Sequence, residues 1–500
     1  MEEQVASYAP RGGLPALPPP VDTTSPFARL RTRFFATPLD AALSILFGLL
    51  AVYIVWSLVQ WAIVDAVFVG NDRTACLDTP EREVGACWAF VAARFSQFIY
   101  GLYPIEQRWR VDWVFGLGAV LIALVAIPRV PFKKLFALLL LGVYPLVVLV
   151  LLTGGQFDMS GSGIAIVFML AAAATIFLAF GRSSTVSRTL PMKIALWLTV
   201  LSAVVGVVSF YYAPGGSESI LTFRFNTFAQ IAFYAALVAI VLALVATIAT
   251  ADDRLAAVRL LVPTAVAIAF VLILTAPLGI PHVPTNLWGG LLVTLVVALT
   301  GIAFSLPLGI LLALGRQSSM PAVRFLSVVF IEFWRGVPLI TVLFMANFML
   351  PLLLPQGVSF NQLLRVLVGV SLFAAAYMAE VIRGGLQAIP KGQYEGADAM
   401  ALTYWQKMRM IILPQALTLV IPGIVNTFIG LFKDTSLVYI IGLADLLGTI
   451  RRGFNDPVWI TPSTPATGLV FGAFAFWLFC FSMSRYSIFI EGRLARGRKH

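Results

Sequence analysis

Two adjacent opposite charges, Lys433 and Asp434, stand inside an otherwise apolar run over residues 417–447 and are followed by Thr435 and Ser436. If this run crosses a membrane, each charge near its middle costs about 2.5 to 3.5 kcal/mol on insertion scales and therefore needs a partner. Consecutive helical side chains point about 100° apart, so the two charges cannot neutralise each other across one helix face. A zwitterionic amino acid would offer a carboxylate to Lys433 and an ammonium group to Asp434. A salt bridge to a neighbouring helix is the alternative interpretation.

Three more charges fall at the edges of apolar runs. Glu380 and Arg383 are three residues apart and can share one helix face. For Glu380 the sequence leaves lining of a substrate pocket and structural pairing equally open. Arg335 precedes a break that length requires, because one helix over residues 323–354 would measure about 48 Å against a hydrocarbon core of about 30 Å. We expect the break at Gly336–Pro338, with Arg335 either acting as a gate or extending to the interface.

The composition explains why these charges are unusual. Of the 500 residues, 60% are hydrophobic and 11% are charged, with a mean hydropathy of +0.93, against about 25% charged residues in soluble domains. The sequence therefore predicts an all-α, polytopic membrane protein. Its apolar runs predict about twelve transmembrane helices, over residues 39–64, 113–127, 134–152, 163–180, 191–211, 226–250, 259–278, 287–314, 323–354 (broken), 363–385, 417–447 and 466–490.

Positive charge predicts the orientation. Lys and Arg recur in every second loop and in the C-terminal "GRLARGRKH", so we expect both termini in the cytoplasm and the chain in a bacterial inner membrane. The same pattern accounts for most of the net charge of +11, and no nucleic-acid partner is expected. Residues 1–38, rich in Pro and without periodicity, are predicted to be a disordered cytoplasmic tail.

The longest predicted outer loop spans residues 65–112 and contains Cys76 and Cys87. On the oxidising side of the membrane these two cysteines could form a disulfide. Two unpaired thiols are the alternative, because sequence spacing does not fix the geometry that a disulfide needs.

An amphipathic segment over residues 393–417 interrupts the apolar sequence on the predicted cytoplasmic side. Its apolar residues recur at helical spacing, and polar residues fall mainly between them. Such a helix could lie on the membrane surface or enter a groove on a partner, and periodicity alone does not decide between the two. The apolar positions are Ala397, Met400, Ala401, Tyr404, Met408, Ile411 and Ile412.

The order of residues within this segment, "EGADAMALTYWQKMRMIILP", resembles the cytoplasmic loop motif of ABC importer permeases. The motif places Glu, a small residue and Ala first, then Gly after three residues, and finally Ile, any residue, Leu and Pro. Ala401 departs from it at the Gly position. The matching positions are Glu395, Gly396, Ala397, Ile411, Leu413 and Pro414.

Three other stretches, "FWRGVPLITVLFM", "AAAYMAEVIRGGLQAIPKGQ" and "LFKDTSLVYIIG", resemble the polar amino acid branch of those permeases, including systems for glutamate, glutamine, aspartate and asparagine. The resemblance implies a five-helix permease domain over residues 279–500, with a coupling loop at 387–416. It also implies a separate pair of ATPase subunits, a second homologous permease subunit and a periplasmic amino-acid-binding protein. Residues 39–278, with about seven helices, would be an extension of that domain.

The chain itself carries no signature of catalysis. It contains no Gly-Lys pair and thus no phosphate-binding loop of the Walker type, so we expect no cofactor here, with ATP and Mg bound by the partner ATPase. His282 and His500 suggest no metal site. The alternative function is an ion-coupled secondary amino acid transporter, a class often built from repeated halves, but no similarity relates the first six predicted spans to the last six.

Overall fold

The computed structural model describes residues 33–80, 83–155, 157, 160–180, 189–212, 218–220, 223–250, 259–276, 278–353 and 361–496. Most of the predicted N-terminal tail, residues 1–32, lies outside this part of the chain. The structure divides into two compact units, Met1–Ala93 with Pro457–Thr467, and Arg94–Asp456 with Gly468–His500. The predicted domain boundary at residue 278 rests on the family resemblance and stays a prediction.

The first unit contains α3 and two short helical segments, and α4 begins in it. Thr37 and Asp40 cap the start of α3 reciprocally, through a 3.1 Å bond from the Asp40 amide to Thr37 Oγ1 and a 3.2 Å bond from the Thr37 amide to Asp40 Oδ2. None of the α3 side chains is buried, as expected of a helix that faces lipid or a partner. The elements are α3 (Pro38–Val59), η1 (Gln60–Val64), η2 (Arg73–Cys76) and α4 (Trp88–Tyr100).

The second unit begins with the remaining extension helices. Two three-residue strands pair as an antiparallel hairpin between α9 and α10, which the sequence did not predict. The elements are η3 (Ile105–Gln107), α5 (Arg108–Ala126), α6 (Lys133–Leu138), η4 (Leu139–Val143), α7 (Tyr144–Thr153), α8 (Gly161–Phe180), α9 (Leu190–Tyr212), β1 (Glu218–Ile220), β2 (Phe223–Phe225), α10 (Thr227–Thr250) and α12 (Val262–Thr275).

The C-terminal half supplies the remaining helices, including the longest one, α23. They are η6 (Thr285–Leu287), α13 (Gly290–Arg316), α14 (Pro321–Gly336), α15 (Leu339–Phe344), η7 (Met345–Met349), α16 (Leu350–Leu353), α17 (Gln362–Gln387), α18 (Lys391–Ala399), α19 (Tyr404–Lys407), η8 (Met408–Ile412), α20 (Leu413–Leu419), α21 (Ile421–Asp434), η9 (Thr435–Ile441), α22 (Leu446–Gly453) and α23 (Ser463–Arg496).

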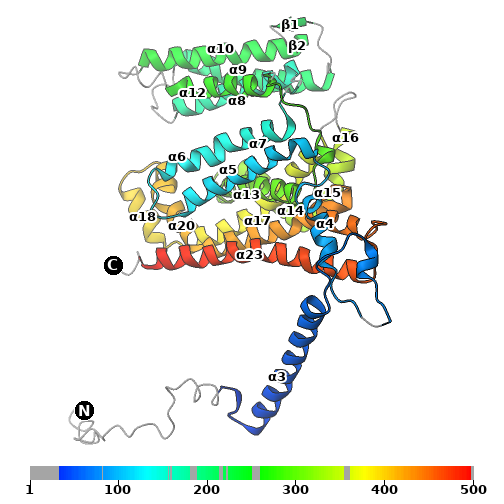
Figure 1. Ribbon diagram of the computed structural model, residues 1–500. Coiled ribbons are helices and arrows are strands. Elements are labelled where there is room, and N and C mark those ends of the chain that lie inside the picture. The colour runs from blue at the N-terminus through cyan, green and yellow to red at the C-terminus, as the bar shows by residue number, and fades with distance from the viewer. Residues whose placement is uncertain are drawn as a thin grey trace, which may run out of the picture. The chain divides into compact units, whose positions relative to one another are not determined.

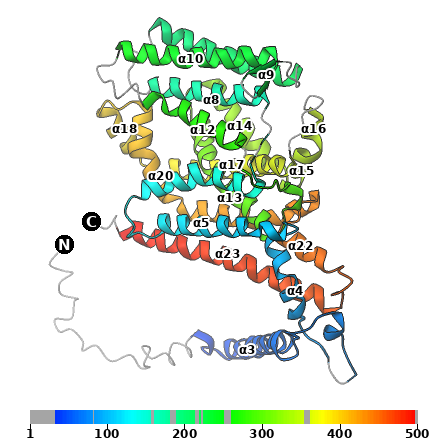
Figure 2. The same ribbon diagram turned by 45° about the horizontal axis from the view of Figure 1, so that its top comes forward.

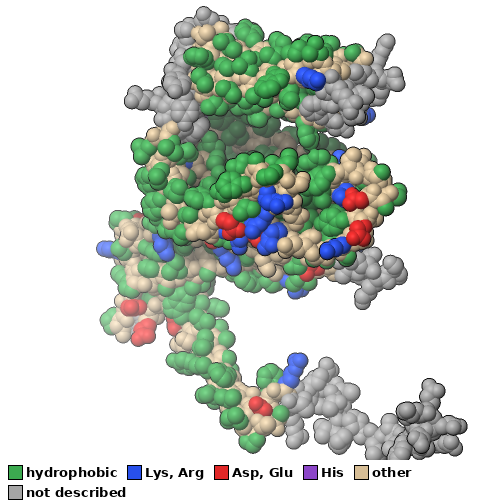
Figure 3. Space-filling model, turned by 180° about the vertical axis from the view of Figure 1, so that it is seen from behind, with side chains coloured by type: hydrophobic (Ala, Val, Ile, Leu, Met, Phe, Trp, Pro, Cys, Tyr) green, Lys and Arg blue, Asp and Glu red, His purple; other side chains and the backbone are tan. Residues whose placement is uncertain are grey.

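The helix lengths confirm the all-α membrane fold. Among the described residues, 10 helices are long and apolar enough to cross a membrane, and an eleventh span arises if the bent pair of α14 with α15–α16 counts as one. The predicted span over residues 259–278 corresponds to α12, which is only 14 residues long and would reach about 21 Å of an approximately 30 Å core. Hydrophobic side chains cover most of the visible surface in Figure 3, as contact with lipid tails requires.

Two kinds of packing hold the second unit together. In α8, α9 and α10, which lie side by side in Figures 1 and 2, buried alanines such as Ala172, Ala195 and Ala236 let the helices approach closely. In the C-terminal half a glycine does the same for α13 and α17. A Cβ atom on Gly309 would lie 2.7 Å from Met378 Cγ, so this position requires glycine.

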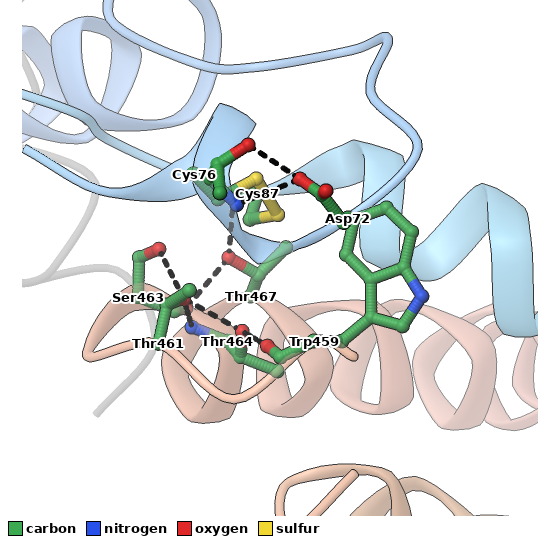
Figure 4. The surroundings of a disulfide bond; sticks show 9 residues. Asp72, Cys76, Cys87, Trp459, Thr461, Ser463, Thr464 and Thr467 are labelled. Atoms are coloured by element: carbon green, nitrogen blue, oxygen red, sulfur yellow. Dashed lines mark hydrogen bonds between the residues drawn. A yellow bond between two sulfur atoms is a disulfide. The ribbon is translucent and has the colours of Figure 1, made fainter. Parts of the chain in front are cut away.

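A disulfide joins Cys76 and Cys87 within the predicted outer loop (Figure 4). Both cysteines are buried, and the Cys87 amide donates a 2.9 Å hydrogen bond to Thr467 Oγ1 in the first turns of α23. Thr464 Oγ1 donates in turn to the Trp459 carbonyl oxygen at 2.6 Å. The disulfide loop thus rests on the residues that start the last helix, 380 positions later in the chain.

We expect the Cys76→Ser, Cys87→Ser double variant to lose the local stability that loop closure provides, about 2 to 3 kcal/mol. Limited proteolysis of the purified protein should cut this loop at least tenfold faster than in the wild type. Cys480→Ser is the matched control, because Cys480 is a free thiol, and its cleavage rate should not change. Equal rates in all three proteins would contradict a stabilising role for the disulfide.

Candidate functional site

The amphipathic segment folds as two short helices joined by a tight turn. The first helix, α18, spans Lys391–Ala399. The chain turns directly after it, where the Ala401 amide donates a 2.9 Å hydrogen bond to the Asp398 carbonyl oxygen. Then Thr403 caps α19 reciprocally with Gln406, so the second helix starts at a defined residue. In Figures 1 and 2, α18 lies beside α20, which leads back into the bundle.

Ala401 is the residue at which the chain reverses. Its φ of +56° lies in the left-handed region, and the only other described non-glycine residue there is Phe132. The departure from the family motif therefore does not prevent the turn, because Ala401 adopts the backbone conformation that glycine would adopt. This conformation costs a residue with a Cβ atom about 1 to 2 kcal/mol.

Ala401→Gly should relieve this strain and stabilise the turn by about 1 kcal/mol after the larger entropy loss of glycine is subtracted. Hydrogen exchange of the Leu402 amide, which bonds the Ala397 carbonyl oxygen, should slow about fivefold, since 1.4 kcal/mol corresponds to a factor of ten. Ala399→Gly is the control and should speed exchange instead, because Ala399 is helical. Faster exchange of the Leu402 amide in Ala401→Gly would contradict the proposed backbone strain at Ala401.

One part of the segment faces the chain itself. Met408 and Ile412 are buried in a cluster with Leu314 of α13, Ile331 of α14 and Ile382 of α17. Ala397 is buried as well, whereas Ile411 and Leu413 are half-buried. The buried residues of the segment therefore share one hydrophobic core with these three helices.

A second set of apolar residues faces outward. Met400, Trp405 and Met410 are 75%, 60% and 67% exposed, and the Tyr404 ring packs edge-on against Trp405 with centroids 5.5 Å apart. The predicted apolar positions divide between two faces, because Met400, Ala401 and Tyr404 are exposed. Trp405 was not among the predicted positions. We call Met400, Tyr404, Trp405 and Met410 the apolar tip.

Polar contacts fix the shape of the segment. Lys407 Nζ binds the Asp398 carboxylate across the turn, and Gln415 Nε2 donates to Gln393 Oε1 at 3.0 Å. Tyr394 donates to the Leu386 carbonyl oxygen at 3.3 Å, and burial raises the pKa of the Tyr394 hydroxyl. Glu395, Gly396 and Pro414, predicted from the motif, are all exposed and thus accessible to a partner.

The charged pair lies at the end of α21. Lys433 is exposed and Asp434 is half-buried, and neither forms an ion pair among the described residues. Thr435 is buried and donates to the Phe432 carbonyl oxygen at 2.7 Å, while Ser436 donates to the Lys433 carbonyl oxygen at 2.9 Å. Both hydroxyl groups are thus engaged with the backbone but keep free acceptor capacity.

Glu380 is the centre of an ion cluster. Its carboxylate lies 2.7 Å from Arg316 of α13, 2.7 Å from Arg383 of α17 and 3.7 Å from Arg335 of α14. Arg316 also binds Glu332 at 2.9 Å. This arrangement favours structural pairing over pocket lining for Glu380. It also includes Arg316 and Glu332, which the sequence analysis did not propose as site residues.

The break between α14 and α15 confirms the length argument. α14 ends at Gly336, α15 starts at Leu339, and the two axes differ by 104°. Arg335, in the last turn before the break, contacts Glu380 and stacks over the Tyr377 ring with 5.8 Å from Cζ to the centroid. Two residues of α17 therefore hold the guanidinium in place. An arginine that only extended to the membrane interface would not need these contacts.

Comparison with known proteins identifies the class. A helical bundle with embedded charges and a projecting loop is consistent with a membrane transport component, and the family model for the binding-protein-dependent transport system inner membrane component matches residues 305–496. This stretch contains the broken helix, the ion cluster, the amphipathic segment and the charged pair.

Full-length relatives define the family more narrowly. The chain is 39% identical to the inner membrane amino-acid ABC transporter permease protein YhdY of Escherichia coli (strain K12), over 89% of this chain and 88% of the relative. It is 40% identical to the glutamate/glutamine/aspartate/asparagine transport system permease protein BztC of Rhodobacter capsulatus, over 96% of both. The chain therefore belongs to the family of amino-acid ABC transporter permeases.

A shorter relative shows that part of the chain is additional. The glutamate/aspartate import permease protein GltK of Escherichia coli O157:H7 is 32% identical over 96% of its own length but only 43% of this chain. Nearly the whole of GltK is thus matched by less than half of this chain. YhdY and BztC also match most of the residues of this chain that GltK does not cover.

Proposed function

We propose that this chain translocates polar L-amino acids from the periplasm to the cytoplasm as a multi-pass inner membrane subunit of an ABC importer. The observation that carries the proposal is the amphipathic segment over residues 393–417, called the coupling segment from here on. Its buried residues share a hydrophobic core with α13, α14 and α17, while its apolar tip is exposed. An exposed cluster of Met, Trp and Tyr is the composition of an interface rather than of a solvated loop. The substrate class follows the names of YhdY and BztC.

The partners follow from the same assignment. A pair of ATPase subunits would bind ATP and Mg and receive the apolar tip, with Glu395 and Gly396 beside it. A second homologous permease subunit would complete the pathway, and a periplasmic amino-acid-binding protein would deliver the substrate. No cofactor is assigned to this chain.

The orientation is part of the proposal. Both termini are assigned to the cytoplasm, because the basic residues alternate between loops. The disulfide between Cys76 and Cys87 supports an oxidising outer face for the loop that contains it.

Reconstitution tests the function. The chain and its partner subunits, in liposomes with the binding protein, should take up labelled glutamate or glutamine only when ATP is supplied on the cytoplasmic side. Uptake driven by an ion gradient, with the purified chain alone, would instead support the secondary transporter.

The substrate-binding residues are proposed as Lys433 and Asp434, with Thr435 and Ser436 beside them. Two charges of opposite sign without ion-pair partners among the described residues match the two ends of an amino acid. Lys433→Ala and Asp434→Ala should each weaken substrate affinity about tenfold or more, because charge-assisted hydrogen bonds are lost. Unchanged affinity in both variants, with assembly intact, would contradict this site.

A further inference from the structure

A small cavity lies where the end of α4, the start of α13 and α22 meet. Its volume is about 80 Å³, and its wall includes Gln97, Asn286, Trp288, Thr449 and Arg452. The backbones close one side, since a Cβ atom on Gly101 would lie 2.4 Å from the Gly289 Cα. Asn286 and Arg452 are exposed, so solvent reaches these two lining residues.

The cavity is rich in hydrogen-bond donors that have no acceptor. The Trp288 side chain is buried, and its indole Nε1 has no hydrogen-bond partner among the described residues. The side-chain amides of Gln97 and Asn286 have none either. The Arg452 guanidinium donates one 3.2 Å bond to the Gly442 carbonyl oxygen, which leaves most of its five N–H groups free.

Nothing negative balances the Arg452 charge inside the cavity. Among the described residues that line it, none is acidic. Asp445 follows the lining residue Ala444, but its carboxylate accepts the amides of Leu447 at 3.1 Å and Gly448 at 2.9 Å and caps α22. Thr449 Oγ1 is occupied as well, accepting from the Gly290 amide and donating to the Ala444 carbonyl oxygen.

We propose that this cavity binds a carboxylate group, with Arg452 as the cationic partner and Trp288, Gln97 and Asn286 as further donors. A guanidinium beside neutral donors matches the geometry and charge of a carboxylate. The volume admits a carboxylate but not a whole dicarboxylic amino acid, so only the end of a larger molecule enters. The helix that contributes Gln97 belongs to the extension, which gives α4 a role in binding.

The carboxylate could come from a free amino acid or from an acidic side chain on the binding protein. This inference rests on the proposed function, because both sources belong to an importer. It differs from the Lys433 and Asp434 site, since none of those residues lines the cavity.

The experiment uses the whole reconstituted complex and three variants. Arg452→Gln removes the charge, and Trp288→Phe removes the indole N–H while keeping an aromatic ring. Arg451→Gln is the matched control, because Arg451 is the neighbouring exposed arginine of α22 and does not line the cavity. Acetate and L-glutamate binding are measured by calorimetry, and the half-stimulating concentration of the binding protein is measured by ATP hydrolysis.

Weakening of acetate binding by about tenfold or more in Arg452→Gln, and to a smaller degree in Trp288→Phe, would identify a free carboxylate as the ligand. If the wild type binds no acetate but both variants raise the half-stimulating concentration about tenfold, the ligand is an acidic side chain of the binding protein. Both variants matching Arg451→Gln in both measurements would overturn the inference. ATP-driven uptake by the wild-type complex is measured in parallel. If the wild type takes up substrate, failure of the carboxylate inference leaves the proposed function intact.

Discussion

Trp405→Ala is expected to weaken binding of the ATPase subunits about 30-fold and thereby to uncouple the chain from ATP hydrolysis. Trp405 is 60% exposed, packs edge-on against Tyr404 and lies in the turn region that also presents Met400. An aromatic residue at the centre of an interface typically contributes 2 kcal/mol or more, which corresponds to about this factor in affinity. The measurement is the ATPase subunit concentration that gives half-maximal assembly with the purified permease.

Trp197→Ala provides the matched control. Trp197 is 72% exposed on α9 and is thus at least as accessible as Trp405, but it lies outside the coupling segment. Its removal should leave ATPase affinity unchanged. If both tryptophan variants assemble as the wild type does, the apolar tip is not the contact surface and the segment lies on the membrane instead.

The difference between the two faces of this segment marks the limit of sequence reasoning. Helical periodicity identifies the apolar positions, but it does not tell which of them pack on the chain and which project to a partner. Ala397, Met408 and Ile412 are buried, whereas Met400 and Tyr404 are exposed. The turn at Ala401, where φ is positive, sets the direction of the second helix and hence this division.

The spans themselves were predictable because the hydrocarbon thickness fixes how long an apolar helix must be. The break at Gly336–Pro338 followed from the same argument, and the structure confirms it with a bend of 104°. α4 was missed, because its residues, Trp88–Tyr100, were read as part of the outer loop. Long-range partners were also out of reach, since Glu380 and Arg316 are 64 positions apart.

Glu380→Gln is expected to destabilise the permease by about 2 kcal/mol. The Glu380 side chain is only 15% exposed, and its carboxylate forms ion pairs with Arg316, Arg335 and Arg383. Without this carboxylate the three guanidinium groups repel one another. Loss of one partner of a fully buried ion pair costs about 3 to 5 kcal/mol of folding free energy, and the cost is smaller where water reaches the charges. Thermal unfolding of the purified protein, followed by loss of helical signal, measures the change.

Glu332→Gln is the matched control, because it removes the same charge from an exposed side chain of the ion cluster. Glu332 belongs to the same cluster through Arg316, but its side chain is 55% exposed, so its loss should cost about 0.5 kcal/mol or less.

The two interpretations of Glu380 predict opposite results for Glu380→Gln. A structural pair lowers the stability of Glu380→Gln and leaves substrate affinity near that of the wild type. A pocket residue lowers substrate affinity while the unfolding temperature stays the same, and that outcome would return Glu380 to the substrate site.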